Sequence, residues 1–216
     1  MICSRNLKVL IGKHDFKAIV RLDFKQALSL IYMTYNLSII EKALRLAAVA
    51  HQKQTRKEID LPYIIHPVMV AMKLEKHGFS EIVIAAALVH DVLEDTDVSK
   101  ETLVGALGAE VVSLIEPTTH DNTLSWDEKK IKYIELVRGA SEEVKAISVA
   151  DKIHNAECLL FAHAAEGRDV WKYFKAGRDK KIWFEEAMLT MLRETWKHPL
   201  VDEYGLLVEK LRELSH

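Results

Sequence analysis

Turn-forming residues are scarce in this sequence, which has only 8 Gly and 4 Pro among 216 residues. They are scattered, so no linker rich in Gly, Ser or Pro divides the chain, and alternating β-branched runs are few. The two cysteines cannot build a disulfide framework, and neither has the nearby second cysteine of a structural zinc site. We therefore expect an all-α fold with short loops, in a reducing compartment.

Long apolar runs and a strong charge of one sign are also absent. No segment approaches the roughly 18 apolar residues of a membrane span, and the N-terminus has no continuous apolar core of a signal peptide. The formal net charge of −2 at pH 7 gives no general attraction to nucleic acid or anionic lipid. We expect a soluble, cytoplasmic protein with no nucleic-acid or membrane partner, in which any polyanion site is local.

Residues 1–32 differ from the rest of the chain in charge, with six Lys or Arg against two Asp. Met33 follows this basic segment directly. Two interpretations stay open: an extension upstream of an alternative start at Met33, or an accessory amphipathic helix. With 49% hydrophobic residues, the remaining 33–216 are long enough for one substantial core, and we predict a single domain there.

Capping signals divide this domain into helices. Ser38 with Glu41, and Ser125 with Glu128, have the spacing of a capping box, and Ser141 precedes the longest apolar periodicity. Helices are predicted at about residues 38–52, 66–77, 80–93, 99–107, 109–115, 125–137, 141–160, 169–176, 178–196 and 200–214.

A histidine and three carboxylates gather at the end of the predicted helix 80–93 and just after it: His90, Asp91, Glu94 and Asp95. If the helix is continuous, the i,i+3 and i,i+4 spacings place them on one face. The eight residues before His90 are all apolar, so we expect this helix to enter the core and carry its polar group to a buried place. Unpaired charge is costly there, and a cation would relieve the cost.

Two distant residues complete a mixed nitrogen and oxygen ligand set with His90 and Asp91. His66 opens a predicted helix, and Asp151 lies within the longest one. Imidazoles and carboxylates without a thiolate suit manganese, iron, magnesium or zinc. Such an ion keeps positions open for water and substrate and lowers the pKa of the water. The two acids one helical turn further on are placed to orient that water and take its proton.

Basic residues near these positions suit an anionic substrate. Arg56 and Lys57 precede His66 by a short loop, and Lys152 adjoins Asp151. Arginine binds phosphate oxygens with two parallel hydrogen bonds, and lysine acts as a point charge. Each of them alone is typical of a solvated surface, but together they indicate a phosphate ester.

Four motifs in this order resemble the HD-domain superfamily, and within it the hydrolase domain of RelA/SpoT-type enzymes and the stand-alone small alarmone hydrolases. They are residues 51–57, 62–67, 86–96 and 150–155. The resemblance spans about residues 38–160. It implies a compact multi-helix HD-domain bundle, one divalent metal ion that is manganese, and removal of the 3′-pyrophosphate from ppGpp or pppGpp.

The resemblance also implies roles for individual residues. The implied metal ligands are His66, His90, Asp91 and Asp151. The implied catalytic residues are Glu94 and Asp95. Arg56 and Lys57 match the basic loop of the family and Asn155 a substrate contact, and with Lys152 they form the predicted substrate-binding set. No synthetase activity is expected, because residues 161–216 are too few for a further catalytic domain.

Two places depart from the pattern of the alarmone hydrolases. Glu157 stands where a basic residue is usual, and residues 118–121 lack the usual lysine, so both changes remove positive charge. An HD-type nucleotidase or phosphohydrolase for another nucleotide or small phosphate ester therefore stays open. A nucleotide-binding module without catalysis and a purely structural helical protein are the other classes. The sequence leaves the oligomeric state open.

Overall fold

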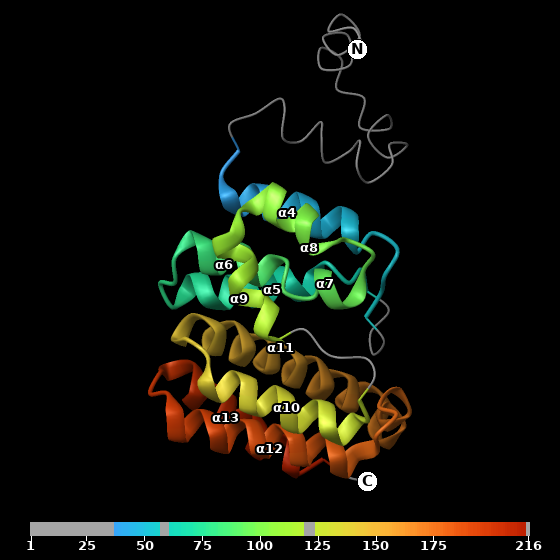
Figure 1. Ribbon diagram of the computed structural model, residues 1–216. Helices are drawn as coiled ribbons and strands as arrows, with labels where there is room; N and C mark the ends of the chain where they lie inside the picture. The colour runs from blue at the N-terminus through green and yellow to red at the C-terminus, as the bar shows by residue number, and fades with distance from the viewer. Residues whose placement is uncertain (1–36, 57–60, 119–123, 215–216) are drawn as a thin grey trace, which may run out of the picture. The chain divides into compact units, whose positions relative to one another are not determined.

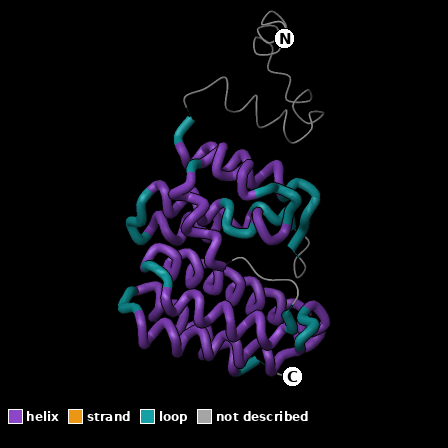
Figure 2. Tube along the Cα trace, viewed as in Figure 1, coloured by secondary structure: helices purple, strands orange, loops and turns teal. Residues whose placement is uncertain are grey.

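The computed structural model describes residues 37–56, 61–118 and 124–214. Ser38–His216 form one compact unit and Met1–Leu37 another, and the fold described below is that of the first. Its described residues form helices and no β-strand, with one isolated antiparallel bridge between Thr55 and Pro62 (Figure 2). The prediction of an all-α fold is confirmed. The predicted extension, residues 1–32, lies outside the described residues, and the boundary at Met33 stays a prediction.

The helices follow one another with short connections. In chain order they are α4 (Ile39–Ala50), α5 (Ile65–Lys76), α6 (Glu81–Leu88), α7 (Val92–Asp95), α8 (Lys100–Leu107), α9 (Ala109–Ile115), the 3₁₀ helix η1 (Glu116–Thr118), α10 (Trp126–Gly139), α11 (Glu142–Glu166), the 3₁₀ helix η2 (Gly167–Tyr173), α12 (Gly177–Thr195) and α13 (Pro199–Arg212).

Serine caps fix the starts of several helices where the sequence predicts them. The hydroxyl oxygen of Ser38 accepts from the Glu41 amide at 3.2 Å, and Ser99 and Ser141 cap α8 and α11 in the same way. At α10 both halves of the predicted capping box between Ser125 and Glu128 are present. Helix ends are less predictable: α10 continues to Gly139, and α11 runs six residues beyond the expected end, to Glu166.

Helix α11 lies in the middle of the fold (Figure 1). It packs against α5 on one side and against α13 on another, while α4 and α9 pack on α6 and α12 packs on α13 and α10. Most of its residues from Val144 to Ala162 are buried, including the polar side chains of Asp151, Lys152 and His154. A helix enclosed in this way can present polar groups to a protected site.

Among the described residues, no helix is both long enough and apolar enough to cross a membrane.

Candidate metal centre

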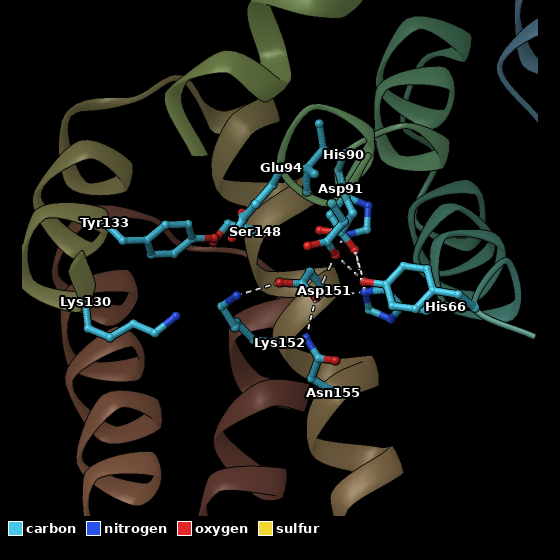
Figure 3. Close-up of a pocket in the computed structure, with 13 residues that line it drawn as sticks. His66, His90, Asp91, Glu94, Lys130, Tyr133, Ser148, Asp151, Lys152 and Asn155 are labelled. Carbon is cyan, nitrogen blue, oxygen red and sulfur yellow. Dashed lines mark hydrogen bonds and ion pairs between the residues drawn. The ribbon is translucent and has the colours of Figure 1, made fainter. Parts of the chain in front are cut away.

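Three parts of the fold bring the four predicted ligands together (Figure 3). His66 is the second residue of α5, and its side chain is buried. His90 and Asp91 lie in the turn between α6 and α7. Asp151 lies in the middle of α11 and is 8% exposed. The contacts of α5 with both α6 and α11 therefore create the site.

The continuous helix predicted through residues 80–93 is wrong. Helix α6 ends at Leu88, residues 89–91 form a turn, and α7 begins at Val92. Nδ1 of His90 donates to the Ala87 carbonyl at 2.7 Å. A side chain therefore bonds to one of the last carbonyl groups of α6. Because of this break, both His90 and Asp91 point toward α11. A straight helix with i,i+4 spacing would not place these two neighbouring residues on the same side.

The nitrogen and oxygen atoms of the site lie within reach of one ion. Ligand atoms of His66, His90 and Asp151 all lie within 4.8 Å of one another. Oδ1 of Asp151 is 3.1 Å from Nε2 of His66 and 3.9 Å from Nε2 of His90. Oδ2 of Asp91 is 3.1 Å from Nε2 of His90 and 3.5 Å from Nε2 of His66. The structure thus brings all four residues together, while their role as ligands stays a prediction.

The electrostatics of the cluster keep its carboxylates charged. Burial disfavours charge on Asp91, but the charge of the neighbouring His90 outweighs burial and holds the Asp91 pKa below its usual range. At Asp151, burial is outweighed by Lys152 and then His66, and its pKa is also lowered. For His90, burial is outweighed by Asp91 and Asp151, which raise the pKa to about 9. Two buried anions beside two imidazoles match the donor set of a divalent transition-metal ion.

His90 supplies a direct test of whether the residues fit a metal. Its Nδ1 is occupied by the Ala87 carbonyl, which leaves Nε2 as the ligand atom. This Nε2 is buried, faces the carboxylates and has no hydrogen-bond partner among the described residues. An ion at the centre of the cluster would satisfy it, so the residues fit a bound divalent cation.

A second ring of contacts orients these side chains. Nδ1 of His66 lies 2.7 Å from Nδ1 of His154, whose pKa is lowered to about 3 by burial, by His66 and by Arg56. The neutral His154 ring can therefore accept from His66 and leave Nε2 of His66 free to bind an ion. On the other side, the Tyr63 hydroxyl donates to Oδ2 of Asp91 at 2.6 Å. Neither contact could be predicted from sequence spacing.

The predicted catalytic acids, Glu94 and Asp95, both line the pocket from α7 and are exposed. Oδ2 of Asp95 lies 3.3 Å from the Tyr63 hydroxyl. Burial, then Asp91 and Glu94, raise the Asp95 pKa. The side-chain amide of Gln54 donates to the backbone carbonyl of Asp95 at 2.6 Å and anchors this short helix. Acids at the open side of the cluster are placed to meet an incoming water.

The predicted substrate-binding residues differ in their positions. Arg56 is buried and donates to Oδ1 of Asn155 at 2.9 Å, and Asn155 in turn donates to Oδ1 of Asp151 at 2.5 Å. Lys152 lines the pocket, but its ammonium lies 2.5 Å from Oδ2 of Asp151, so its charge supports that carboxylate first. Lys57 lies outside the described residues.

Sequence reasoning missed four further residues that line the pocket: Lys130, Tyr133, Ile147 and Ser148. Ser148 lies one helical turn before Asp151, so its periodicity in α11 was an available signal. Lys130 and Tyr133 come from α10, and only the packing of that helix places them at the site (Figure 3). No local motif marks them.

Glu157 does not approach the pocket. Its carboxylate pairs with Lys73 of α5 at 2.8 Å, and it is not among the lining residues. The Glu157 carboxylate therefore does not add its negative charge to the wall of the pocket. The other departure, at residues 118–121, extends from η1 into residues outside the described part of the chain.

Comparisons with known proteins match more than half of this chain. The sequence profile of the HD domain family matches residues 43–182. The guanosine-3′,5′-bis(diphosphate) 3′-pyrophosphohydrolase MESH1 of Xenopus tropicalis is 35% identical over 130 residues, which cover 59% of this chain and 73% of that protein. A solved structure described as a metazoan orthologue of SpoT that hydrolyses ppGpp has a TM-score of 0.69 at 29% identity, covering 84% of this chain and 99% of the other. The solved structure of lmo0812 from Listeria monocytogenes has a TM-score of 0.63 at 35% identity. The match covers 69% of this chain and 97% of the other.

Proposed function

The chain belongs to the HD domain family, and from this membership we propose that it is a metal-dependent phosphohydrolase that removes pyrophosphate from the 3′ position of (p)ppGpp. The observation that carries the proposal is that ligand atoms of His66, His90 and Asp151 lie within 4.8 Å of one another. Asp91 contacts both histidines, and two further acids line the same pocket. The relatives whose printed names state this activity support the choice of substrate.

The proposed ion is manganese, held by His66, His90, Asp91 and Asp151. When bound, it supplies Lewis-acid stabilisation of a phosphoryl oxygen and lowers the pKa of water. His154 and Tyr63 hold two of the ligands in place through the contacts described above. The proposed compartment is the cytoplasm, and the proposed partner is the nucleotide substrate.

The reaction is a hydrolysis in which the chain moves one proton. Glu94 or Asp95 accepts a proton from the attacking water, whose oxygen bonds to the phosphorus next to the ribose. The bond between that phosphorus and the ribose 3′ oxygen breaks, and this oxygen takes up a proton. The products are inorganic pyrophosphate and a nucleotide with a free 3′ hydroxyl, which is guanosine 5′-diphosphate from ppGpp and guanosine 5′-triphosphate from pppGpp. Arg56 and Asn155, already bonded to each other, hold the nucleotide at the edge of the pocket.

Product analysis tests the proposal directly. Purified protein with manganese should release pyrophosphate from ppGpp, and Asp91→Ala should lower kcat/KM by at least about 1,000-fold, because removing a ligand removes the ion and its Lewis acidity. Asp97→Asn is the matched control, since Asp97 is exposed and does not line the pocket. Full activity in Asp91→Ala would refute the ligand set.

The identity of the product separates the alternatives. Release of orthophosphate or triphosphate from other nucleotides would favour a nucleotidase. Tight nucleotide binding by calorimetry without any turnover, at saturating manganese, would favour a binding module.

A further inference from the structure

Lys130 is the only cation among the lining residues of the pocket that neither the motifs nor the proposed chemistry uses. It comes from α10, across the pocket from the two histidines (Figure 3). Its ammonium lies 4.6 Å over the Phe184 ring, and Tyr133, one turn later on the same face, also lines the pocket. Lys130 therefore places a cation at the wall of a pocket that the acidic Glu94 also lines.

The charge of Lys130 is held in an unfavourable environment. Burial, then Lys152 and Lys181, lower its pKa to about 8, although Glu94 and Asp151 act in the opposite direction. An ammonium with a lowered pKa at the wall of a cleft is typical of a functional site, because a bound anion restores the lost stabilisation of charge.

The size of the pocket indicates which part of a nucleotide reaches this ammonium. The cavity volume is about 170 Å³. Pockets that enclose a drug-sized ligand are larger, about 300–1,000 Å³. The cavity therefore encloses the reacting phosphate group and its immediate neighbour, and the rest of the nucleotide stays outside. Arg56 does not line the cavity, so it is placed for that outer part.

We propose that Lys130 forms a subsite for the terminal phosphate of the 3′-diphosphate, an assignment that rests on the proposed function. The reacting phosphorus must lie at the ligands His66, His90, Asp91 and Asp151. The terminal phosphate is one bridging oxygen away from it, whereas the 5′ phosphates lie across the ribose ring. Lys130 then favours a 3′-diphosphate over a 3′-monophosphate as substrate, and it stabilises the negative charge on the pyrophosphate that forms.

The test compares four proteins: wild type, Lys130→Met, Lys130→Arg and the matched control Lys132→Met. Methionine keeps the apolar stem over Phe184 and removes the charge. Lys132 is exposed on the same helix and does not line the pocket. Loss of one charge-assisted contact should lower kcat/KM for ppGpp about 10- to 100-fold in Lys130→Met. Lys130→Arg should recover most of the activity, and Lys132→Met should behave as wild type.

Two further measurements locate the contact. Inhibition by inorganic pyrophosphate should weaken in Lys130→Met by a similar factor, while inhibition by orthophosphate changes little. Guanosine 5′-monophosphate 3′-diphosphate should show the same loss as ppGpp, because it retains the 3′-diphosphate. Two results would overturn the assignment. One is a smaller loss of kcat/KM in Lys130→Met for the nucleotide with the 5′-monophosphate than for ppGpp. The other is an equal weakening of inhibition by pyrophosphate and by orthophosphate.

The outcome is separable from that of the proposed function. If the wild-type chain releases no pyrophosphate from ppGpp, the proposed function fails. Calorimetric titration of the manganese-loaded proteins with pyrophosphate and orthophosphate then tests Lys130 without turnover. Weaker binding of pyrophosphate alone in Lys130→Met would support the subsite, and unchanged binding would refute it.

Discussion

Tyr63 orients the proposed ligand Asp91 through a hydroxyl that donates to Oδ2 at 2.6 Å. Partners of this kind typically change metal affinity by about 10- to 100-fold when removed, because the ligand loses its fixed orientation. We expect Tyr63→Phe to weaken manganese binding about 10-fold in a calorimetric titration. Tyr173→Phe is the control, since its hydroxyl contacts Glu166 away from the pocket. Equal affinities in wild type and Tyr63→Phe would show that Asp91 needs no such support.

The pKa of Lys130 predicts an alkaline limit to activity. Charge on this side chain is lost above about pH 8, with Lys152 and Lys181 favouring the loss and Glu94 and Asp151 opposing it. Because kcat/KM reports the free enzyme, it should fall as the pH rises through about 8. Lys130→Arg keeps its charge and should shift the fall to higher pH. An identical alkaline limb in both proteins would assign it to another group.

The same pKa predicts that the folded chain becomes more stable as the pH rises, although activity falls. Because the Lys130 pKa is about 8 in the folded chain and near 10.5 when exposed, the unfolded chain holds more protons between these values. The free energy of unfolding should therefore rise with pH between about 8 and 10.5. Below pH 8 the buried ammonium is charged in the folded chain and lowers the free energy of unfolding by its full amount. At pH 7, Lys130→Met should therefore be more stable by about 1–3 kcal/mol, measured by urea unfolding. A destabilised variant would assign Lys130 a structural role.

Individual site residues were predictable where a residue type that can bind metal stands in an apolar stretch of the sequence. His66, His90, Asp91 and Asp151 stand out because imidazoles and carboxylates in apolar surroundings need a reason to be there. Lys130 had no such signal, since a lysine on an amphipathic helix is ordinarily solvated. Its position at the pocket depends on how α10 packs on α12 and α11.

At the scale of elements, the capping box of α10 controls the segment that carries Lys130. The Ser125 hydroxyl accepts from the Glu128 amide, and the Glu128 carboxylate accepts from the Ser125 amide. Ser125→Ala should lower the free energy of unfolding by about 1 kcal/mol, seen as a lower urea midpoint at unchanged slope. Ser113→Ala on α9 should stay within about 0.5 kcal/mol, because that serine is exposed and its hydroxyl donates to the Glu110 carbonyl inside the helix rather than capping an end. Equal losses in the two variants would contradict a specific capping role.

Helix starts were more predictable than helix ends. Side-chain caps such as Ser38, Ser99 and Ser141 are local, so sequence spacing identifies them. The end of α6 depends instead on the bond between His90 and the Ala87 carbonyl, which apolar periodicity does not reveal. That one contact explains why the predicted single helix is two helices with a turn between them.

For the whole molecule, metal binding should appear as thermal stability. An ion that binds only the folded chain stabilises it by about 2.7 kcal/mol at 100 times its Kd. For a domain of this size that corresponds to a rise in Tm of about 5–10 °C, measurable by calorimetry with and without manganese. Asp91→Ala should lose the shift. A rise of the same size in that variant would place the stabilising ion elsewhere.

The site joins parts of the chain that are far apart, since His66 and its partner His154 are separated by 88 positions. During refolding, closing so long a loop costs entropy before any contact across it is gained, so we expect the cluster to form late. Uptake of an ion should therefore mark the completion of refolding rather than its beginning, and a rapid-mixing signal from the bound ion would time the last step of assembly.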